Sequence, residues 1–251
     1  MIFKNLFPWQ RKHTLLFADY AWSNRPVVLE TEVDMSSILQ HRQMSANKIS
    51  YISYFIKAFS DVLEKFPDAN SMIIGNFLPN IIQLKNINAK FTLDKTLEGR
   101  RIVTSAVILN SNHISLEQIQ ERVNYFKSHD FKSCSEFKPI RILQKIPLPF
   151  GRLLFNYTMK NANLKSKVQG SFTITSLGGR DVSRFIPLSG STISLGLSDI
   201  IDKPIVKEGQ IKIKPITNIV LVFDHRVLDG AISAEILSEL KKYLENNFFR
   251  I

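Results

Sequence analysis

The chain has a single cysteine, Cys134, among its 251 residues. One thiol cannot form an internal disulfide, and it cannot supply the several sulfur ligands of a cysteine-based metal cluster. Cys134 stands in a polar stretch, so we expect it to be a loop residue and not a nucleophile. We also expect no metal site.

Long apolar runs are missing as well. No stretch approaches the roughly 20 apolar residues that a membrane-spanning helix needs, and the first twelve residues lack a sustained apolar stretch followed by a small-residue cleavage site. We therefore expect a cytoplasmic protein with no membrane partner. The 44% hydrophobic content is enough for a sizeable core. Without an internal repeat, a low-complexity tract or a linker, residues 1–251 are expected to form one domain.

Acidic residues are nearly absent from residues 138–184, where nine basic residues face one acid, Asp181. This stretch carries +8 of the net charge of +11. Such a surface attracts acidic partners, for example the phosphates of a nucleotide-like cofactor or an acidic carrier protein. A basic surface that only contacts solvent and binds no partner explains the charge equally well. No zinc finger, helix-turn-helix signature or RNA-binding aromatic motif accompanies it, so we expect no nucleic acid partner.

Hydrophobic periodicity predicts alternating strands and helices. The predicted helices cover residues 36–42, 48–66, 115–127 (with Ser115 and Gln118 as a capping box), 152–167 and 231–246. The predicted strands cover residues 26–34, 81–93, 101–109, 172–175, 192–197, 204–206, 211–213 and 219–223, with turns at 94–99 and 207–209. Three prolines, Pro139, Pro147 and Pro149, argue against a continuous helix before Gly151. The helix at 152–167 has Phe155, Met159 and Ala162 on one side, which suits packing on its own domain better than lying on an anionic membrane.

The most informative feature is His225, which stands at the end of the apolar strand at 219–223. A neutral imidazole accepts a proton on one ring nitrogen when an acceptor fixes the hydrogen on the other. Asp229 stands four residues later, where a helix begins, and can order the site by pairing with an arginine. Gly230 lets a backbone or a ligand come close. Spacing alone favours a plainer interpretation, in which His225 is a hydrogen-bonded strand-end residue and Asp229 caps the helix.

The residues around His225 resemble the His-x-x-x-Asp-Gly motif of the catalytic domain of 2-oxoacid dehydrogenase acyltransferases (dihydrolipoyl transacylases), which are related in fold to chloramphenicol acetyltransferase. Three further stretches look alike in the same order, so the resemblance covers about residues 11–244. They are residues 32–34 with 48–50 and 55–71, residues 171–178, and residues 203–206 with 209–211.

This resemblance implies a two-layer α/β sandwich with a mixed sheet, built into a homotrimer whose active site lies between subunits. By matching positions, His225 is the general base and Thr175 supplies the hydroxyl that stabilises the oxyanion. Asp229 is the structural acid of the motif, and its arginine partner is Arg11, Arg25 or Arg226. His225 and Thr175 then come from different chains.

The sequence also departs from the family pattern. It shows no lipoyl domain, no subunit-binding domain and no Pro/Ala-rich linker, and residues from about 129 to 170 look like a basic insertion. We therefore expect a standalone acyltransferase that takes an acyl group from a thioester of coenzyme A, or from phosphopantetheine on an acidic acyl carrier protein. The acceptor is a small molecule with a thiol, amine or hydroxyl group.

Two competing interpretations remain. A serine hydrolase lacks its signature here, because the nearest approach to Gly-x-Ser-x-Gly, at residues 196–200, has no second glycine. The other alternative is a non-catalytic oligomeric scaffold or a carrier-protein docking module with the same fold. The presence of His225, Asp229, Gly230 and Thr175 together favours the enzyme.

Overall fold

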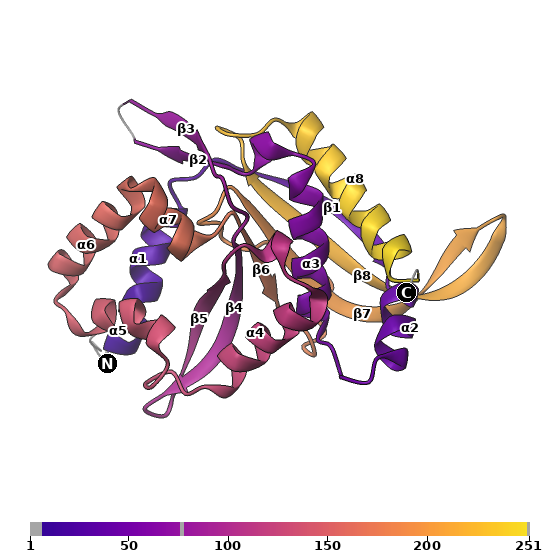
Figure 1. Ribbon diagram of the computed structural model, residues 1–251, viewed down its shortest axis with the longest axis horizontal. Coiled ribbons are helices and arrows are strands. Elements are labelled where there is room, and N and C mark those ends of the chain that lie inside the picture. The colour runs from indigo at the N-terminus through magenta and orange to yellow at the C-terminus, as the bar shows by residue number, and fades with distance from the viewer. Residues whose placement is uncertain (1–6, 76–77, 250–251) are drawn as a thin grey trace, which may run out of the picture.

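The computed structural model describes residues 7–75 and 78–249 and contains a six-stranded mixed sheet (Figure 1). The strands are β1 (Pro26–Asp34), β2 (Ser71–Ile74), β3 (Asn80–Gln83), β4 (Ala89–Leu97), β5 (Arg100–Ile108), β6 (Phe172–Ser176), β7 (Ile193–Lys207) and β8 (Gln210–Asp224). The order in the main sheet is β1-β8-β7-β6-β4-β5, while β2 and β3 form a separate hairpin. β6 runs parallel to both β7 and β4, and the other neighbours are antiparallel.

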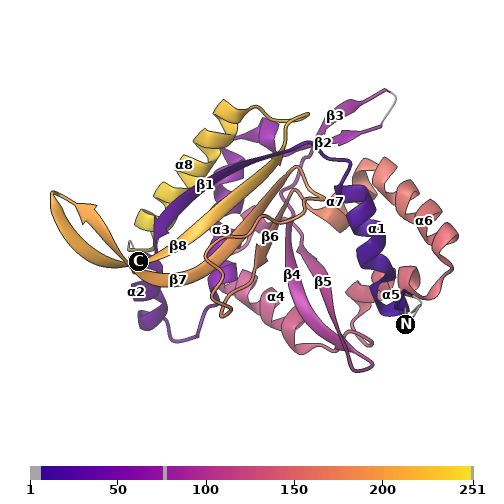
Figure 2. The same cartoon turned by 180° about the vertical axis from the view of Figure 1, so that it is seen from behind.

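Helices lie on one face of this sheet and beside its β5 edge. They are α1 (Lys12–Ala21), α2 (Ser36–Met44), α3 (Tyr51–Glu64), α4 (Leu116–Ser128), α5 (Lys138–Lys145), α6 (Leu148–Lys160), α7 (Ala162–Gln169) and α8 (Gly230–Asn246). α3, α4 and α8 lie on the face seen in Figure 1, whereas Figure 2 shows the opposite face of β1, β8 and β7 without a covering helix. The predicted two-layer α/β fold with a mixed sheet is confirmed.

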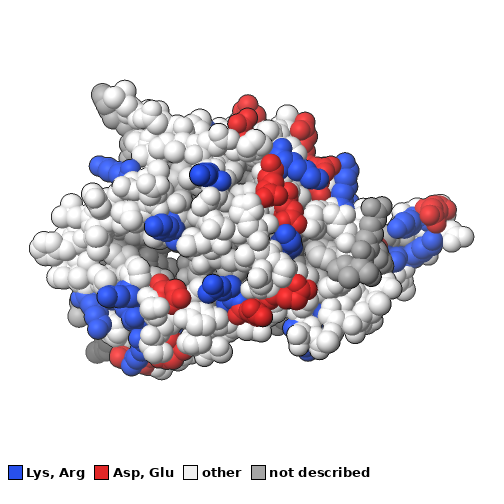
Figure 3. Space-filling model, in the orientation of Figure 1, with Lys and Arg blue, Asp and Glu red and all other residues white. Residues whose placement is uncertain are grey.

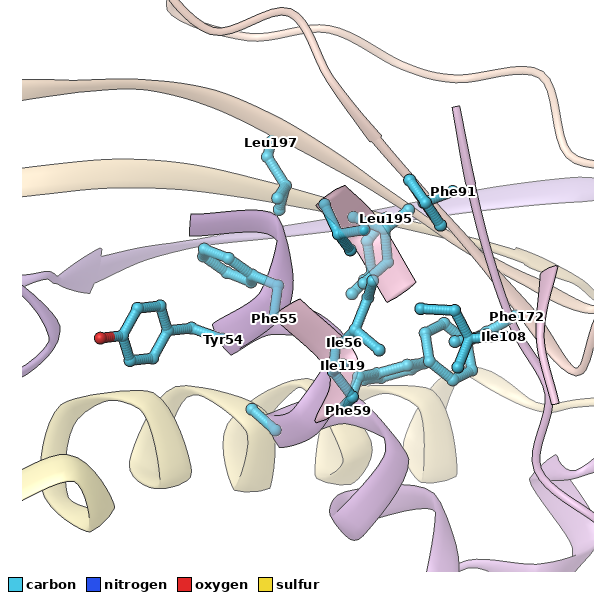
Figure 4. Packing of buried hydrophobic residues seen from close by; sticks show 14 of the residues in the cluster. Tyr54, Phe55, Ile56, Phe59, Phe91, Ile108, Ile119, Phe172, Leu195 and Leu197 are labelled. Atoms are coloured by element: carbon cyan, nitrogen blue, oxygen red, sulfur yellow. The ribbon is translucent and has the colours of Figure 1, made fainter. Parts of the chain in front are cut away.

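The main core lies between the sheet and α3 (Figure 4). Phe55, Ile56 and Phe59 are all buried, which is the apolar side that the sequence predicted for this helix. The Phe59 ring meets the Phe172 ring of β6 edge-on, with 4.8 Å between the ring centroids. This packing fixes which side chains of β6 face the helices, and therefore which face the other side of the sheet.

A smaller cluster joins α1 to α5, α6 and α7 beside the β5 edge of the sheet. Its buried members are Leu16, Phe155 and Met159. The predicted helix at 152–167 is wrong in its bounds, because Asn161 ends α6 and its side chain caps α7 by accepting a hydrogen bond from the Leu164 amide. Helices also precede Gly151, since the prolines stand in the first turns of α5 and α6, where a missing N–H costs nothing.

Other predicted elements differ mainly in their bounds. The run at 81–93 is divided between β3 and β4, and β4 continues to Leu97 through most of the predicted turn. The last four predicted strands are two long ones, β7 and β8, joined at the predicted turn by Glu208 and Gly209, which both have positive φ. α1 was not predicted. The capping box of Ser115 and Gln118 is confirmed at the start of α4. Cys134 lies between α4 and α5, as a buried free thiol.

The outer parts of β7 and β8 form an arm that projects from the sheet (Figures 1 and 2). β1 pairs with β8 only from Ile216 onward, and β6 pairs with β7 only as far as Leu197, so the arm has no other strand beside it. Val206 pairs with Ile211 and Pro204 pairs with Ile213, which places these four side chains on one face. Val206, Ile211 and Ile213 are all more than 70% exposed. An apolar face of this kind is typical of a contact with another molecule.

No helix within residues 7–75 and 78–249 is long and apolar enough to cross a membrane.

A lysine side chain is buried in β4. The Lys90 ammonium group donates a 2.5 Å hydrogen bond to Gln169 and lies 4.9 Å from the centroid of the Phe17 ring. Burial lowers the pKa of Lys90 from 10.5 to about 7. Between these two pH values the unfolded chain holds a proton at this position that the folded chain has released, so the free energy of unfolding rises with pH.

We therefore expect Lys90→Met to stabilise the protein at pH 7, by an amount that shrinks as the pH rises towards 10. In this window Lys90 contributes a slope of about 1.4 kcal/mol per pH unit, which the variant loses. Denaturant unfolding at a fixed protein concentration, repeated between pH 7 and 10, measures the slope. The exposed Lys85→Met is the control. Equal slopes for the wild type and Lys90→Met would contradict the prediction.

Candidate functional site

His225 lies directly after β8, in a tight turn between the sheet and α8. Its backbone N–H donates a 2.9 Å hydrogen bond to the carbonyl of Arg25, the residue just before β1. Its side chain is 49% exposed, and Nδ1 lies 3.7 Å from Oδ1 of Asp229. This distance exceeds that of a hydrogen bond, so the carboxylate acts on the imidazole as a nearby negative charge. The structure thus brings together the two motif residues, with Nδ1 of His225 on the side of Asp229.

The turn that holds His225 depends on an ion pair between the buried Asp224 and the partly exposed Arg226. The Asp224 carboxylate accepts hydrogen bonds from the Arg226 backbone N–H at 3.1 Å and from Arg226 Nε at 2.9 Å. Arg226 Nη2 also donates to Asn24 at 3.1 Å. Burial alone raises the pKa of Asp224, but the hydrogen bonds and charge of Arg226 outweigh it and hold the pKa below 3.8. Asp224 and Arg226 flank His225 in sequence, so they fix its backbone on both sides.

Asp229 has no arginine partner within the part of the chain that the structure describes. Arg226 pairs with Asp224 instead, and the Arg25 side chain donates only to the backbone of Ser23, at 3.5 Å. Arg11 precedes α1, roughly 15 Å along the helix from the end near Asn24 and Arg25. Within one chain none of the three candidates pairs with Asp229, and an arginine partner from a second chain stays a prediction.

The Asp229 side chain is 89% exposed. Asp229 occupies the N-cap position of α8, yet its side chain makes no capping hydrogen bond; its carbonyl instead accepts hydrogen bonds from Ser233. Next to it, a Cβ added to Gly230 would meet no atom within 4 Å. The start of α8 is thus an open surface in the single chain, with room for another molecule to approach.

Thr175 lies on β6, on the sheet face opposite to α3. Side chains alternate along a strand, and Phe172 faces the helices, so Thr173 and Thr175 face the other side. Thr173 confirms this orientation, because its hydroxyl lies 2.6 Å from that of Ser191 in the loop between β6 and β7. Thr175 is only half-buried, and its hydroxyl makes no hydrogen bond within the described residues. It is therefore available to a ligand.

Two features shape the backbone beside Thr175. The Asp199 carboxylate accepts hydrogen bonds from three successive N–H groups that follow β6, of Gly179, Arg180 and Asp181, at 2.5–2.9 Å. Gly196, the register partner of Thr175, passes so close to the β6–β7 loop that an added Cβ would lie 2.5 Å from the Phe185 carbonyl oxygen. Asp199 and Gly196 thus fix the loop near Thr175, although neither belongs to a recognised sequence motif.

His225 and Thr175 are far apart within one chain. Thr175 is in register with Gly196, and Gly196 with Val220, which is five residues before His225. Five residues of extended strand span roughly 17 Å, and two strand spacings add about 10 Å in the perpendicular direction. The two residues are therefore about 20 Å apart. They cannot act on one reacting carbon unless they come from different chains.

Two hollows on the surface of the single chain lie away from the candidate residues. One is lined by Ile114 and by residues of α4, and the other by residues of the β4–β5 hairpin and Lys127; neither includes His225 or Thr175. No group of three or more His, Cys, Asp or Glu side chains in the described ranges is placed to hold a metal ion.

The Asp224–Arg226 pair can be tested by Arg226→Met, which leaves the buried Asp224 carboxylate without its cation. We expect the free energy of unfolding at pH 7 to fall by about 3 kcal/mol, the usual cost of removing one partner from a buried pair. Because the folded-state pKa of Asp224 is lowered, its stabilisation holds above pH 4 and is lost as the pH falls through that folded-state pKa. The difference between the variant and the wild type should therefore shrink in acid.

Denaturant unfolding at pH 7 and near pH 3 measures both effects. Arg184→Met is the control, because Arg184 forms an exposed ion pair with Glu30, and such pairs contribute less than about 1 kcal/mol. An equal fall in the free energy of unfolding of the two variants would show that the Asp224–Arg226 pair does not hold the turn.

Comparisons with known proteins match most of the chain to one family. Residues 21–130 and 153–249 match the family model of the 2-oxoacid dehydrogenases acyltransferase (catalytic domain). The unmatched residues 131–152 fall within the stretch that the sequence suggested as an insertion, whose bounds stay a prediction.

Curated relatives agree with the family match. The succinyltransferase component of the 2-oxoglutarate dehydrogenase complex of Buchnera aphidicola (subsp. Acyrthosiphon pisum) is 28% identical over 201 residues, which are 79% of this chain and 40% of that protein. The acetyltransferase component of the Bacillus subtilis pyruvate dehydrogenase complex is 28% identical over 229 residues, 88% of this chain and 45% of that protein. Both are named dihydrolipoyllysine-residue acyltransferases. The chain spans somewhat under half the length of these relatives.

A solved structure agrees in fold. The dihydrolipoamide acetyltransferase of Azotobacter vinelandii superposes with a TM-score of 0.72 and 19% identity, over 98% of this chain and 93% of that one. It was used to investigate a serine, a histidine and an asparagine in the catalytic mechanism of that enzyme, the histidine and asparagine being four residues apart.

Proposed function

We propose, from the premise that this chain belongs to the 2-oxoacid dehydrogenases acyltransferase (catalytic domain) family, that it transfers an acyl group from a thioester to an acceptor, with His225 as the general base. The observation that carries this proposal is the position of His225 after β8, half-exposed and with Nδ1 3.7 Å from the Asp229 carboxylate. A negative charge near Nδ1 favours the tautomer with its hydrogen on that nitrogen. Nε2 is then free to accept a proton.

The proposed reaction moves one proton and exchanges one bond for another. Nε2 of His225 takes the proton of the acceptor thiol, and the thiolate attacks the thioester carbonyl carbon. The resulting tetrahedral oxyanion receives a hydrogen bond from the Thr175 hydroxyl, which meets charge that exists only at that stage. When the intermediate collapses, the original carbon–sulfur bond breaks, and the leaving thiolate takes the proton back from His225. No net acid or base is consumed.

The names of the two curated relatives favour thiols as the donor and acceptor groups of the proposed reaction. Because both act on a dihydrolipoyl-lysine residue, we propose a dihydrolipoyl group as one thiol and coenzyme A as the other. The relatives transfer different acyl groups, succinyl and acetyl, so the proposal leaves the acyl group open. A carrier-bound phosphopantetheine ends in the same thiol arm as coenzyme A and is the next donor to test.

The working form in this proposal is a homotrimer with the site between subunits. About 20 Å separates His225 from Thr175 in one chain, so a shared site needs a second copy. The apolar face of the arm, formed by Val206, Ile211 and Ile213 with Pro204, suits a contact of this kind. Asp229 and Gly230 lie open at the start of α8, where a neighbouring chain can also bring an arginine to Asp229.

A thiol-release assay tests the function. Acetyl-coenzyme A and succinyl-coenzyme A are offered to the protein with dihydrolipoamide, with a primary amine, with an alcohol, and without an acceptor. The expected result is release of coenzyme A that depends on dihydrolipoamide, together with acyl-dihydrolipoamide identified by mass spectrometry. Release that needs an amine or an alcohol instead would keep the acyl transfer and reject the thiol acceptor. No release with any thioester donor, from a protein that assembles normally, would favour a non-catalytic scaffold.

A further inference from the structure

Helix α6 has apolar side chains on two opposite faces. Phe155 and Met159 are buried against α1 and form the side that the sequence predicted to pack on the domain. The opposite side is exposed and also apolar. Its side chains, here called the α6 ridge, are Phe150 (64% exposed), Leu153 (68%), Leu154 (43%) and Tyr157 (65%). A helix that is apolar all round is normally buried, so the α6 ridge requires an explanation.

The α6 ridge is continuous, because its residues are spaced i, i+3, i+4 and i+7. At 100° per residue these four positions fall within about 100° of the helix circumference, on the side away from Phe155 and Met159. α6 also lies at the periphery of the molecule in both views (Figures 1 and 2). The neighbouring helices each add one exposed apolar side chain, Ile142 of α5 and Leu164 of α7. The result is a convex apolar surface and not a groove.

The charge around the α6 ridge is of one sign. α5, α6 and α7 together contain seven basic residues and no acidic residue. They are Lys138, Arg141, Lys145, Arg152, Lys160, Lys165 and Lys167. Arg152 pairs with Asp19 of α1 at 3.2 Å. Lys145, Lys160 and Lys167 are exposed and form no ion pair within the described residues. In Figure 3 the surface over α6 and α7 shows blue and white atoms.

Charge decides between the possible occupants. A second copy of the chain, docked through the same face about a twofold axis, would bring these lysines against their own copies. An anionic surface instead meets them with the opposite charge. Of the anionic surfaces, a lipid bilayer accepts a convex ridge of Phe, Leu and Tyr without needing a matching groove, and an apolar face bordered by Lys and Arg is the pattern of helices that lie in the membrane interface.

We propose that the α6 ridge inserts into the interface of an anionic lipid bilayer while the lysines around it contact the lipid headgroups. This reverses the expectation of no membrane partner. That expectation came from the missing membrane-spanning run and signal sequence, and from the side of the helix with Phe155, Met159 and Ala162. The family model does not match residues 131–152, which include α5 and Phe150, whereas the other three ridge residues lie in the matched range. The proposal does not depend on the acyl-transfer reaction.

Vesicle co-sedimentation of the purified full chain tests this binding. We expect the wild type to bind phosphatidylcholine vesicles that contain 30% phosphatidylglycerol and to bind pure phosphatidylcholine vesicles at least tenfold more weakly. Leu153→Glu should lower binding to the anionic vesicles at least tenfold. Lys145→Gln combined with Lys160→Gln should lower it severalfold, and more at low salt than at high salt.

The matched control is Met44→Glu, which places the same charge at another exposed apolar position, at the end of α2. Met44→Glu should bind as the wild type does. The proposal is overturned if the wild type does not bind anionic vesicles, or if Leu153→Glu binds like Met44→Glu. It is also overturned if Leu153→Glu lowers the mass of the assembly in light scattering while vesicle binding is absent, because the α6 ridge is then an interface between copies of the chain.

Discussion

Replacing His225 with alanine is expected to lower acyl transfer by on the order of 10³-fold, the usual contribution of a general base. The loss should lie in kcat, because His225 acts on the proton of the acceptor and contributes little to holding the donor. The variant should fold and assemble as the wild type does, since the imidazole is half-exposed and only the backbone of His225 holds the turn. Initial rates of thiol release measure the loss in kcat, and light scattering measures the mass of the assembly.

His113→Ala is the control for His225→Ala, since His113 is an exposed histidine between β5 and α4. It should keep full activity. If His225→Ala retains more than about a tenth of the wild-type rate, the base is a different group. If the variant loses both its activity and its assembly, His225 has a structural role, and its assignment as the general base is not supported.

Mixed assemblies of two inactive variants are expected to regain activity. Thr175→Ala removes the hydroxyl proposed for the oxyanion and should lower kcat by about 10²- to 10³-fold. Because His225 and Thr175 are about 20 Å apart in one chain, a working site takes one residue from each of two chains. In a closed ring of three that contains both His225→Ala and Thr175→Ala chains, one site of the three receives both intact residues. After selection of mixed rings, activity should thus return to about a third of the wild-type value, far above that of either variant alone.

Co-expression with two different affinity tags yields the mixed assemblies, and tandem purification proves that both chains are present. The control pairs two tagged copies of Thr175→Ala, which should stay as inactive as the unmixed variant. Mixed assemblies without activity would show that the two residues do not complete one site between chains. Full activity of Thr175→Ala by itself would remove Thr175 from the site.

The layers of the fold could be predicted because the relevant signals are local. The apolar spacing of α3, the capping box of α4 and the strand that leads to His225 can all be read within a few residues. The division of residues 81–93 between β3 and β4 could not, since both halves are apolar and only tertiary pairing assigns them to different sheets. α6 and α7 were joined in the prediction because Asn161 both ends one helix and caps the next.

The sequence indicated the motif residues of the candidate site, but it did not indicate the residues that hold their backbone in place. The positions of His225, Asp229 and Thr175 came from a resemblance in sequence, and the register of β6, β7 and β8 agrees with a site divided between chains. Sequence reasoning listed Arg226 among three candidate partners of Asp229 and missed its pairing with Asp224, which reads as the last residue of an apolar strand. The role of Asp199 was missed because its three hydrogen-bond donors are backbone N–H groups, which every residue but proline has and which a sequence pattern therefore does not reveal.

The distance between His225 and Thr175 has a consequence for the protein at low concentration. The proposed catalytic centre, divided between chains, exists only while the chains are associated, so we expect dissociated subunits to be inactive however well they are folded. Specific activity should therefore fall on dilution below the dissociation constant of the assembly, and it should return when the protein is concentrated again. The cellular abundance of this chain would then set the activity of each copy as well as the number of copies.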